Sequence, residues 1–179
     1  TPTGTGIVAG SASGTPVVRV VDAAGLVVAD WLTYPPQTNG GTSVAVANLD
    51  GGGNAEVVTV PYTGPLRVRA FNSDGTPFVS TITGLPVDFV VAPAVVGAAT
   101  GFRVAVADID LDDRREILVF PDIAGAKKMF AFELDGTAVA GWPTAQFPFR
   151  PRHVRRPFID TPEKAAAVVS EINASQAAD

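Results

Sequence analysis

The chain repeats itself, and this repetition constrains its fold more than any other feature of the sequence. Residues 43–50 (Ser-Val-Ala-Val-Ala-Asn-Leu-Asp) match residues 103–110 (Arg-Val-Ala-Val-Ala-Asp-Ile-Asp), so the two copies stand 60 positions apart. Each copy is followed by a polar loop and then by an apolar run, at 56–61 and 116–121. Because a fixed period of this length is typical of arrays of similar structural units, the sequence predicts a repeat architecture.

A second recurring pattern lies downstream of these segments and occurs three times, at 17–25, 67–75 and 128–136. Two of the copies end in Asp-Gly, at 74–75 and 135–136, and the third ends in Ala-Gly. Such pairs are typical of tight hairpin turns, because glycine readily adopts the positive φ that these turns require. β-branched and aromatic residues flank the turns, so each copy predicts a strand, a tight turn and a second strand.

Together the two patterns predict an all-β fold of tandem four-stranded antiparallel blades, which is a partial β-propeller of fewer than three repeats. Residues 1–148 divide into units at about 6–41, 42–101 and 102–148, of which the first lacks its opening strand and loop. Residues 149–179 form a separate Arg- and Pro-rich segment that ends in a predicted short C-terminal helix.

Composition narrows the chemistry that such a fold can carry. The 179 residues include no Cys, which excludes disulfides, thiolate zinc sites and cysteine nucleophiles. The net charge of −5 argues against a nucleic-acid partner, because phosphate binding requires a basic surface. The longest apolar stretch, residues 89–99, is interrupted by Pro93, so no membrane span is expected. We expect that any export signal has been removed or lies outside this sequence.

The loop from Asp108 to Glu116 carries the clearest chemistry. Its first, third, fifth and ninth positions are acidic: Asp108, Asp110, Asp112 and Glu116. Hard cations such as Ca²⁺ take six to eight oxygen ligands, and a coiled loop with acids at alternate positions can direct them inward, with the backbone carbonyl of Arg114 as a further ligand. Without a cation, neighbouring charges a few ångströms apart repel by about 1 kcal/mol per pair even in water. The spacing therefore predicts a calcium site.

The equivalent loop in the second unit, from Asn48 to Glu56, is a weaker candidate. It keeps oxygen ligands at the corresponding positions in Asn48, Asp50 and Glu56, but Gly52 replaces the third acid. The lower negative charge predicts either a lower calcium affinity or a metal-free turn.

The order of a strand, a D-x-D-x-D-x-x-x-E/D loop and a hydrophobic strand resembles the FG-GAP/VCBS repeats. These repeats build the β-propellers of integrin α-subunits and of many secreted bacterial proteins, and the similarity covers most of residues 6–143. The stretch 34–41 also resembles the linker between successive bacterial FG-GAP units. In that family the acidic loop holds a structural calcium ion, which implies this role for the four acids of the 108–116 loop and for the carbonyl of Arg114. One departure is Asp113, which replaces the usual glycine at the sixth position, where a left-handed backbone is costly for Asp.

The resemblance further implies a non-enzymatic, extracellular or secreted protein with a structural, adhesive or self-assembly role. Since propellers typically close with four to eight blades, we expect self-association or another protein that completes the propeller. The alternative is a carbohydrate-binding propeller module, or an accessory domain of a secreted polysaccharide-degrading enzyme, with glycans as partners.

Several other residues have both a functional and a structural interpretation. Four aromatic residues near strand ends could stack on sugars or pack between blades: Trp31, Tyr34, Tyr62 and Trp142. His153 is the only His and lies among four Arg in residues 150–156, a run that could bind an acidic ligand or protect an edge strand. Asp110 and Asp112 lie too close in sequence to flank a substrate as a glycosidase pair.

Overall fold

The computed structural model describes residues 6–96, 99, 101–123 and 126–140. The chain divides into two units, Thr1–Phe147 and Pro148–Asp179, and every described residue belongs to the first. The expected C-terminal helix, the Arg-rich run and Trp142 lie outside the described residues. Among the helices of the described part, none has the length and apolar character needed to cross a membrane.

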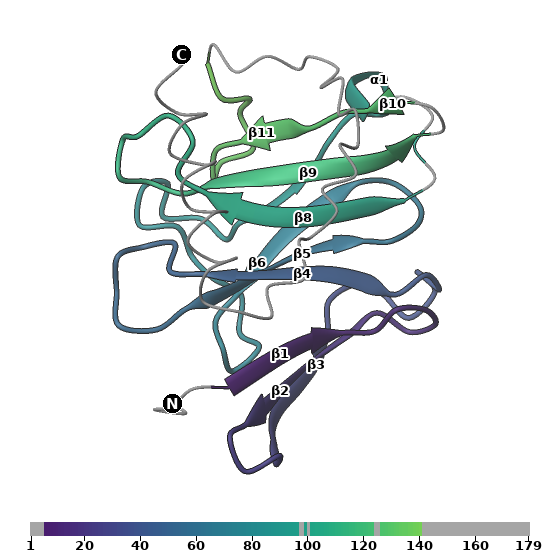
Figure 1. The fold of residues 1–179 in the computed structure, drawn as a ribbon, viewed down its shortest axis with the longest axis vertical. Helices are drawn as coiled ribbons and strands as arrows, with labels where there is room; N and C mark the ends of the chain where they lie inside the picture. The colour runs from purple at the N-terminus through teal and green to yellow at the C-terminus, as the bar shows by residue number, and fades with distance from the viewer. Residues whose placement is uncertain (1–5, 97–98, 100, 124–125, 141–179) are drawn as a thin grey trace, which may run out of the picture. The chain divides into compact units, whose positions relative to one another are not determined.

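The described part is all-β and consists of three antiparallel sheets with one helical turn, α1 (Pro93–Val96) (Figure 1). Sheet 1 has the order β1-β2-β3 and comprises β1 (Gly6–Gly10), β2 (Val17–Asp22) and β3 (Val27–Leu32). Sheet 2 follows the chain order and comprises β4 (Thr42–Ala47), β5 (Glu56–Pro61), β6 (Arg67–Phe71) and β7 (Asp88–Val90). In sheet 3, β9 pairs with three strands, and the sheet comprises β8 (Phe102–Ala107), β9 (Glu116–Ile123), β10 (Ala126–Lys127) and β11 (Phe130–Phe132).

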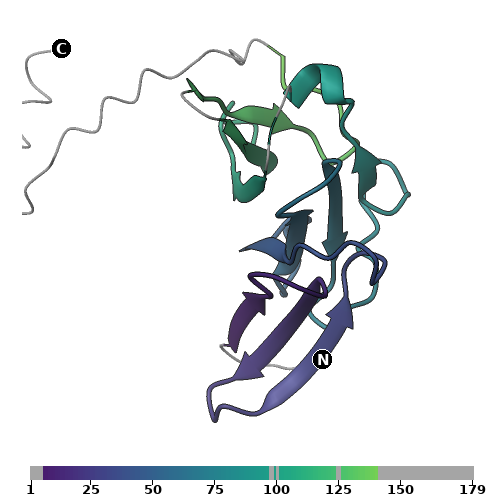
Figure 2. The same cartoon turned by 90° about the vertical axis from the view of Figure 1, so that its right-hand side faces the viewer.

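The three sheets follow one another in chain order, from purple through blue to green in Figures 1 and 2. Strands β1, β5 and β9 occupy equivalent places, because each pairs antiparallel with the strand that leads into a hairpin turn. On their other edges β5 pairs with β4 and β9 pairs with β8. Among the described strands β1 has no such second partner. Sheet 1 therefore lacks the first strand of the repeat, as the sequence predicts.

The hairpin turns share one backbone geometry in all three sheets. The amide of each turn glycine donates a hydrogen bond of 2.9–3.0 Å to the carbonyl three residues earlier. The φ angles of these glycines are all positive, at 83° for Gly25, 86° for Gly75 and 87° for Gly136. Because only glycine adopts this region without steric cost, the turns predicted from Asp-Gly and Ala-Gly are confirmed.

The fourth strand of sheet 2 differs from the prediction because it is made of two pieces. After the turn, the chain pairs with β6 only at the bridge between Phe71 and Pro77, then departs and returns as β7. Pro77 and Pro86 each lack a backbone N–H and so cannot donate to a continuous ladder. The excursion between them lengthens the second unit, in addition to the opening strand and loop that the first unit lacks among the described residues.

Apolar packing joins sheets 2 and 3 through the larger core of the described part. Its fully buried members include Val58, Val60, Val68, Ile117 and Val119. Burial of such a side chain contributes about 1.5–3 kcal/mol, so this core holds the two sheets together.

One aromatic contact recurs between successive sheets. The rings of Trp31 on β3 and Phe71 on β6 lie 5.7 Å apart at an angle of 52°. The rings of Phe89 on β7 and Phe132 on β11 lie 5.8 Å apart at 57°. Each pair contributes about 0.5–1.5 kcal/mol beyond its buried area, and the repetition shows that neighbouring sheets stack in the same way.

Candidate metal site

Two acidic loops connect the first and second strands of sheets 2 and 3. The register of each hairpin places the glutamate that opens the second strand opposite the last residue of the first strand. The first and last acids of a loop therefore lie at the same end of its hairpin. Both loops extend from the left-hand side of the sheets in Figure 1.

The loop between β8 and β9 brings together its four predicted carboxylate ligands. One carboxylate oxygen from each of them lies within 4.8 Å of the others: Asp108, Asp110, Asp112 and Glu116. Four oxygens at this separation can share one cation, which brings them into its coordination sphere. The cluster could thus hold a metal ion.

Glu116 is the buried member of this cluster, and its side chain is 0% exposed. Its Oε2 accepts a hydrogen bond of 2.6 Å from the amide of Ile109. Its Oε1 is also buried, but it has no hydrogen-bond partner in the part of the chain that the structure describes. A buried polar atom without a partner costs about 1–3 kcal/mol, and more when it is charged. The site therefore contains an oxygen that needs a ligand.

Backbone amides of the same loop orient the exposed aspartates. The amides of Leu111 and Asp113 donate to the two carboxylate oxygens of Asp108, at 2.7 and 3.2 Å. The amide of Arg114 donates to Oδ1 of Asp112 at 2.9 Å. These bonds coil the loop tightly, and two non-glycine residues in it adopt positive φ, Leu111 at 64° and Asp113 at 66°. The left-handed conformation at Asp113 agrees with the prediction, whereas that at Leu111 was not expected from the sequence.

The electrostatics of the cluster favour added positive charge. Burial raises the pKa of Glu116, and the charges of Asp110, Glu133 and Asp108 raise it further. Sequence reasoning missed Glu133, which precedes the third hairpin turn. Burial raises the pKa of Glu133, and the charges of Asp110 and Asp112 add to this effect. The sequence carried no signal for this residue, because Glu133 stands well outside the 108–116 loop and belongs to the later turn pattern at 128–136.

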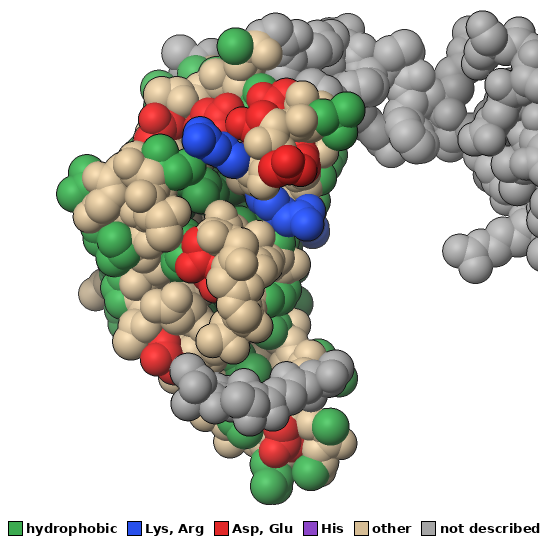
Figure 3. All heavy atoms as spheres, turned by 90° about the vertical axis from the view of Figure 1, so that its left-hand side faces the viewer, with side chains coloured by type: hydrophobic (Ala, Val, Ile, Leu, Met, Phe, Trp, Pro, Cys, Tyr) green, Lys and Arg blue, Asp and Glu red, His purple; other side chains and the backbone are tan. Residues whose placement is uncertain are grey.

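Arg114 does not neutralise this charge. Its guanidinium Nε lies 3.9 Å from Oδ2 of Asp112, with side chains 60% and 45% exposed, and an ion pair of this kind is worth little in water. Figure 3 shows acidic and basic side chains gathered side by side on one face. Arg114 contacts Asp112 through its amide and its side chain, whereas a ligand role for its carbonyl stays a prediction.

The loop between β4 and β5 repeats the anchoring bond with fewer acids. Glu56 is 4% exposed, and its Oε2 accepts a hydrogen bond of 2.7 Å from the amide of Leu49. Oδ1 of Asn48 is buried without a partner among the described residues. The amide of Gly52 donates to Oδ1 of Asp50 at 2.7 Å. This loop has the same hydrogen bond to its last glutamate as the 108–116 loop. Because it carries two carboxylates in place of four, it should attract a cation less strongly.

The aromatic residues near the strand ends have packing contacts. Tyr34 is 4% exposed, and its hydroxyl donates to the carbonyl oxygen of Thr59 or of Arg67, which lie 2.9 and 2.8 Å away. The Tyr62 ring lies under the guanidinium of Arg103, with 4.1 Å between the guanidinium carbon and the ring centroid. Trp31 packs on Phe71, so all three described aromatic residues make contacts within the chain.

No protein-family model and no solved structure matches this chain. Two curated proteins, both named "Putative phosphoenolpyruvate synthase regulatory protein", each match a short part of this chain. One, from Methylibium petroleiphilum, is 76% identical over 29 residues, and the other, from Leptothrix cholodnii, is 60% identical over 35 residues. The matches cover 16% and 20% of this chain and only 11% and 13% of the length of those relatives. Stretches this short establish neither the family nor the activity of the chain.

Proposed function

We propose that this chain is a calcium-stabilised, non-enzymatic β-propeller repeat protein of the FG-GAP/VCBS type with a structural, adhesive or self-assembly role. The observation that carries the proposal is the buried Oε1 of Glu116, which lacks a hydrogen-bond partner in the described part although three further carboxylates lie beside it. A bound cation would satisfy this oxygen and reduce the repulsion among the four acids.

Calcium suits this donor set better than the other common metals. All four side-chain ligands are carboxylates, three of them on the loop between β8 and β9 and the fourth, Glu116, at the start of β9, and Ca²⁺ accepts six to eight oxygens in variable geometry. Zinc prefers nitrogen and sulfur ligands, which these four residues do not offer. Magnesium requires a near-ideal octahedron and retains several waters, so the same loop should bind it less tightly.

The repeated sheets support the propeller part of the proposal. Sheets 2 and 3 each begin with a strand, an acidic loop and a second strand, and the same aromatic contact joins successive sheets. The blades of a propeller are antiparallel modules of up to four strands that follow one another in this way, so the repetition supports the proposal. An extracellular location follows from the resemblance, and calcium sites of extracellular modules work at the high calcium levels found there.

The test is thermal unfolding of the whole chain, first with calcium and then with a chelator. If free calcium stands at about ten times its dissociation constant, one site adds about 1.4 kcal/mol to the free energy of unfolding by mass action. The double variant Asp110→Ala with Asp112→Ala removes two of the four carboxylates, so we expect it to lose this gain.

The matched control is Asp30→Ala, which removes an exposed acid of sheet 1 and should leave the calcium gain intact. Magnesium at the same concentration should stabilise the unaltered chain less than calcium does. If the double variant gains as much stability from calcium as the unaltered chain, the ion does not bind at this loop and the assignment is wrong.

A further inference from the structure

The outer edge of β1 is open in the described structure. The equivalent strands β5 and β9 lie between two neighbours, whereas β1 pairs with β2 alone among the described strands. The open edge therefore presents a row of backbone donors and acceptors that can pair with another extended segment.

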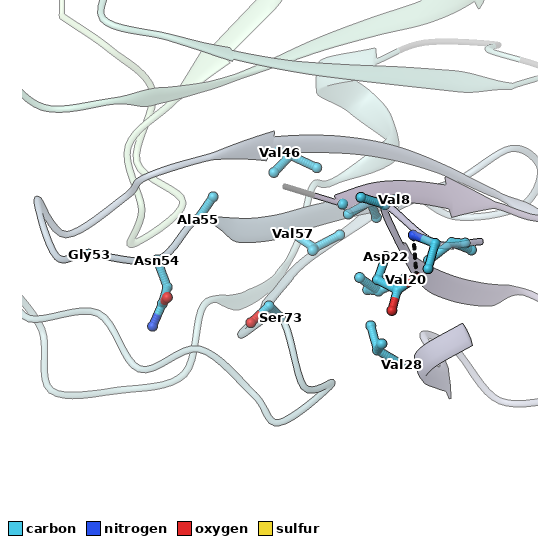
Figure 4. Close-up of a pocket in the computed structure, with 14 residues that line it drawn as sticks. Val8, Val20, Asp22, Val28, Val46, Gly53, Asn54, Ala55, Val57 and Ser73 are labelled. Carbon is cyan, nitrogen blue, oxygen red and sulfur yellow. Dashed lines mark hydrogen bonds between the residues drawn. The ribbon is translucent and has the colours of Figure 1, made fainter. Parts of the chain in front are cut away.

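An apolar groove of about 880 Å³ lies between sheet 1 and sheet 2 (Figure 4). Val8 and Val20 line it from sheet 1, and Val46 and Val57 line it from sheet 2. Val46 is 49% exposed, whereas its counterpart Val106 packs against the core between sheets 2 and 3. The groove between sheets 1 and 2 thus exposes valine side chains whose counterparts between sheets 2 and 3 are packed.

The core between sheets 2 and 3 shows what fills the corresponding space there. Leu49, from the acidic loop after β4, and Leu134, from the turn after β11, both belong to that core. Between sheets 1 and 2 the place of Leu134 is taken by Ser73, which lines the groove. A counterpart of Leu49 would come from a strand and loop paired with β1, and the described part contains no such segment.

We infer that the open edge of β1 and the adjoining groove receive an extended strand-and-loop segment, whose strand pairs with β1 and whose loop places one Leu or Ile side chain between Val8 and Val46. The inference rests on the proposal that the sheets are successive modules of one array. It does not rest on calcium, because Gly6 stands where Glu56 and Glu116 open the equivalent strands.

The two complete modules define the chemistry of this occupant. Their first strands alternate Val and Ala, and the loops begin with Asn-Leu-Asp or Asp-Ile-Asp. Ala47 packs on the core shared with the following sheet, and Ala105 and Ala107 pack on the equivalent face of sheet 3. Small side chains on that face allow two first strands to approach closely. The occupant is therefore a Val-Ala strand followed by an acidic loop with Leu or Ile at its second position.

The experiment uses a fluorescent synthetic peptide with the sequence of residues 102–110 and measures its binding to the whole chain by anisotropy. We expect saturable binding with a dissociation constant below about 1 mM, unchanged by a calcium chelator. Val8→Asp in the protein puts a charge into the groove, and Ile109→Asp in the peptide removes the apolar side chain that fills it. Each change should weaken binding at least about tenfold.

The protein control is Val79→Asp, which puts the same charge on a valine that is 49% exposed and lies outside the groove, and this variant should bind the peptide as before. The inference is overturned if no binding occurs below about 1 mM. It is also overturned if the Ile109→Asp peptide binds as well as the original. If sedimentation shows that the chain self-associates and the peptide does not disrupt this association, a second copy of the chain covers the groove instead. If calcium does not stabilise the unaltered chain but the peptide still binds, the proposed calcium site is wrong and the inference about the groove stands.

Discussion

At the scale of single residues, the backbone of Leu111 is the most unusual feature of the candidate metal site. It combines a φ of 64° with a side chain that is 85% exposed, so no packing of its own favours this conformation. The equivalent residue in the other acidic loop is Gly51, with a φ of 75°. The same turn of the backbone is therefore made by glycine in one loop and by a strained leucine in the other.

Leu111→Gly should stabilise the metal-free chain. A left-handed backbone costs an L-residue about 1–2 kcal/mol, and the greater freedom of glycine in the unfolded state offsets about 0.5–1 kcal/mol of that. We expect a net gain of about 0.5–1 kcal/mol in urea unfolding. The control is Leu85→Gly, at an exposed loop residue outside the set with positive φ, which should lose stability. If both variants lose the same amount of stability, the backbone at Leu111 is not strained.

At the scale of elements, the contact between one sheet and the turn of the next depends on glycine. A Cβ on Gly75 would lie 2.8 Å from the Trp31 ring, and a Cβ on Gly136 would lie 2.7 Å from the Phe89 ring. Gly25 has the same positive φ, but the described residues place no atom within 4 Å of its Cβ position. A substitution at Gly25 therefore tests backbone strain alone, whereas substitutions at Gly75 and Gly136 test backbone strain together with disturbed packing of an aromatic ring.

Alanine substitutions at the three glycines should show two classes of effect. Gly25→Ala should lower the free energy of unfolding by about 1–2 kcal/mol, because only the left-handed backbone disfavours alanine there. Gly75→Ala and Gly136→Ala must also displace an aromatic ring, which adds about 1–3 kcal/mol. Chemical denaturation of the three variants measures the difference. Equal losses at all three positions would show that the rings do not pack on the turns.

At the scale of the whole molecule, three glutamates link stability to pH: Glu56 and Glu116, which are buried at equivalent places, and the half-buried Glu133. The pKa values of Glu56, Glu116 and Glu133 are all raised above the ordinary 4.5, in each case mainly by burial. The folded chain therefore holds protons that the unfolded chain has released. Their contribution to stability is complete below the unfolded pKa and is lost as the pH rises through the folded values.

The metal-free chain should therefore become less stable as the pH rises from about 4.5 towards neutrality. Calcium should cancel this fall, because it favours the ionised carboxylates and competes with protons for them. Urea unfolding across this range, with chelator and with calcium, measures both slopes. Glu116→Gln, which cannot ionise, should flatten the slope of the metal-free chain. A metal-free chain whose stability rises with pH over the same range would contradict this account.

The sequence by itself determined the features that depend on a few neighbouring residues. The repeated Val-Ala segments specify strands, and the glycines specify the hairpin turns. The acids at alternate positions of the 108–116 loop specify a cluster of oxygens that could hold a cation. Local backbone geometry and short-range charge repulsion set each of these features, so they can be recognised from sequence spacing. The missing first strand of the opening unit was visible for the same reason.

Only the tertiary structure decided what is buried and what is left open. The unpartnered Oε1 of Glu116, the nearby Glu133 and the groove beside β1 depend on residues far apart in the chain meeting in space. Leu111 adopts its strained φ because the coiled loop and its hydrogen bonds outweigh the local preference of leucine. Long-range packing sets burial, and no spacing rule within one segment contains that information.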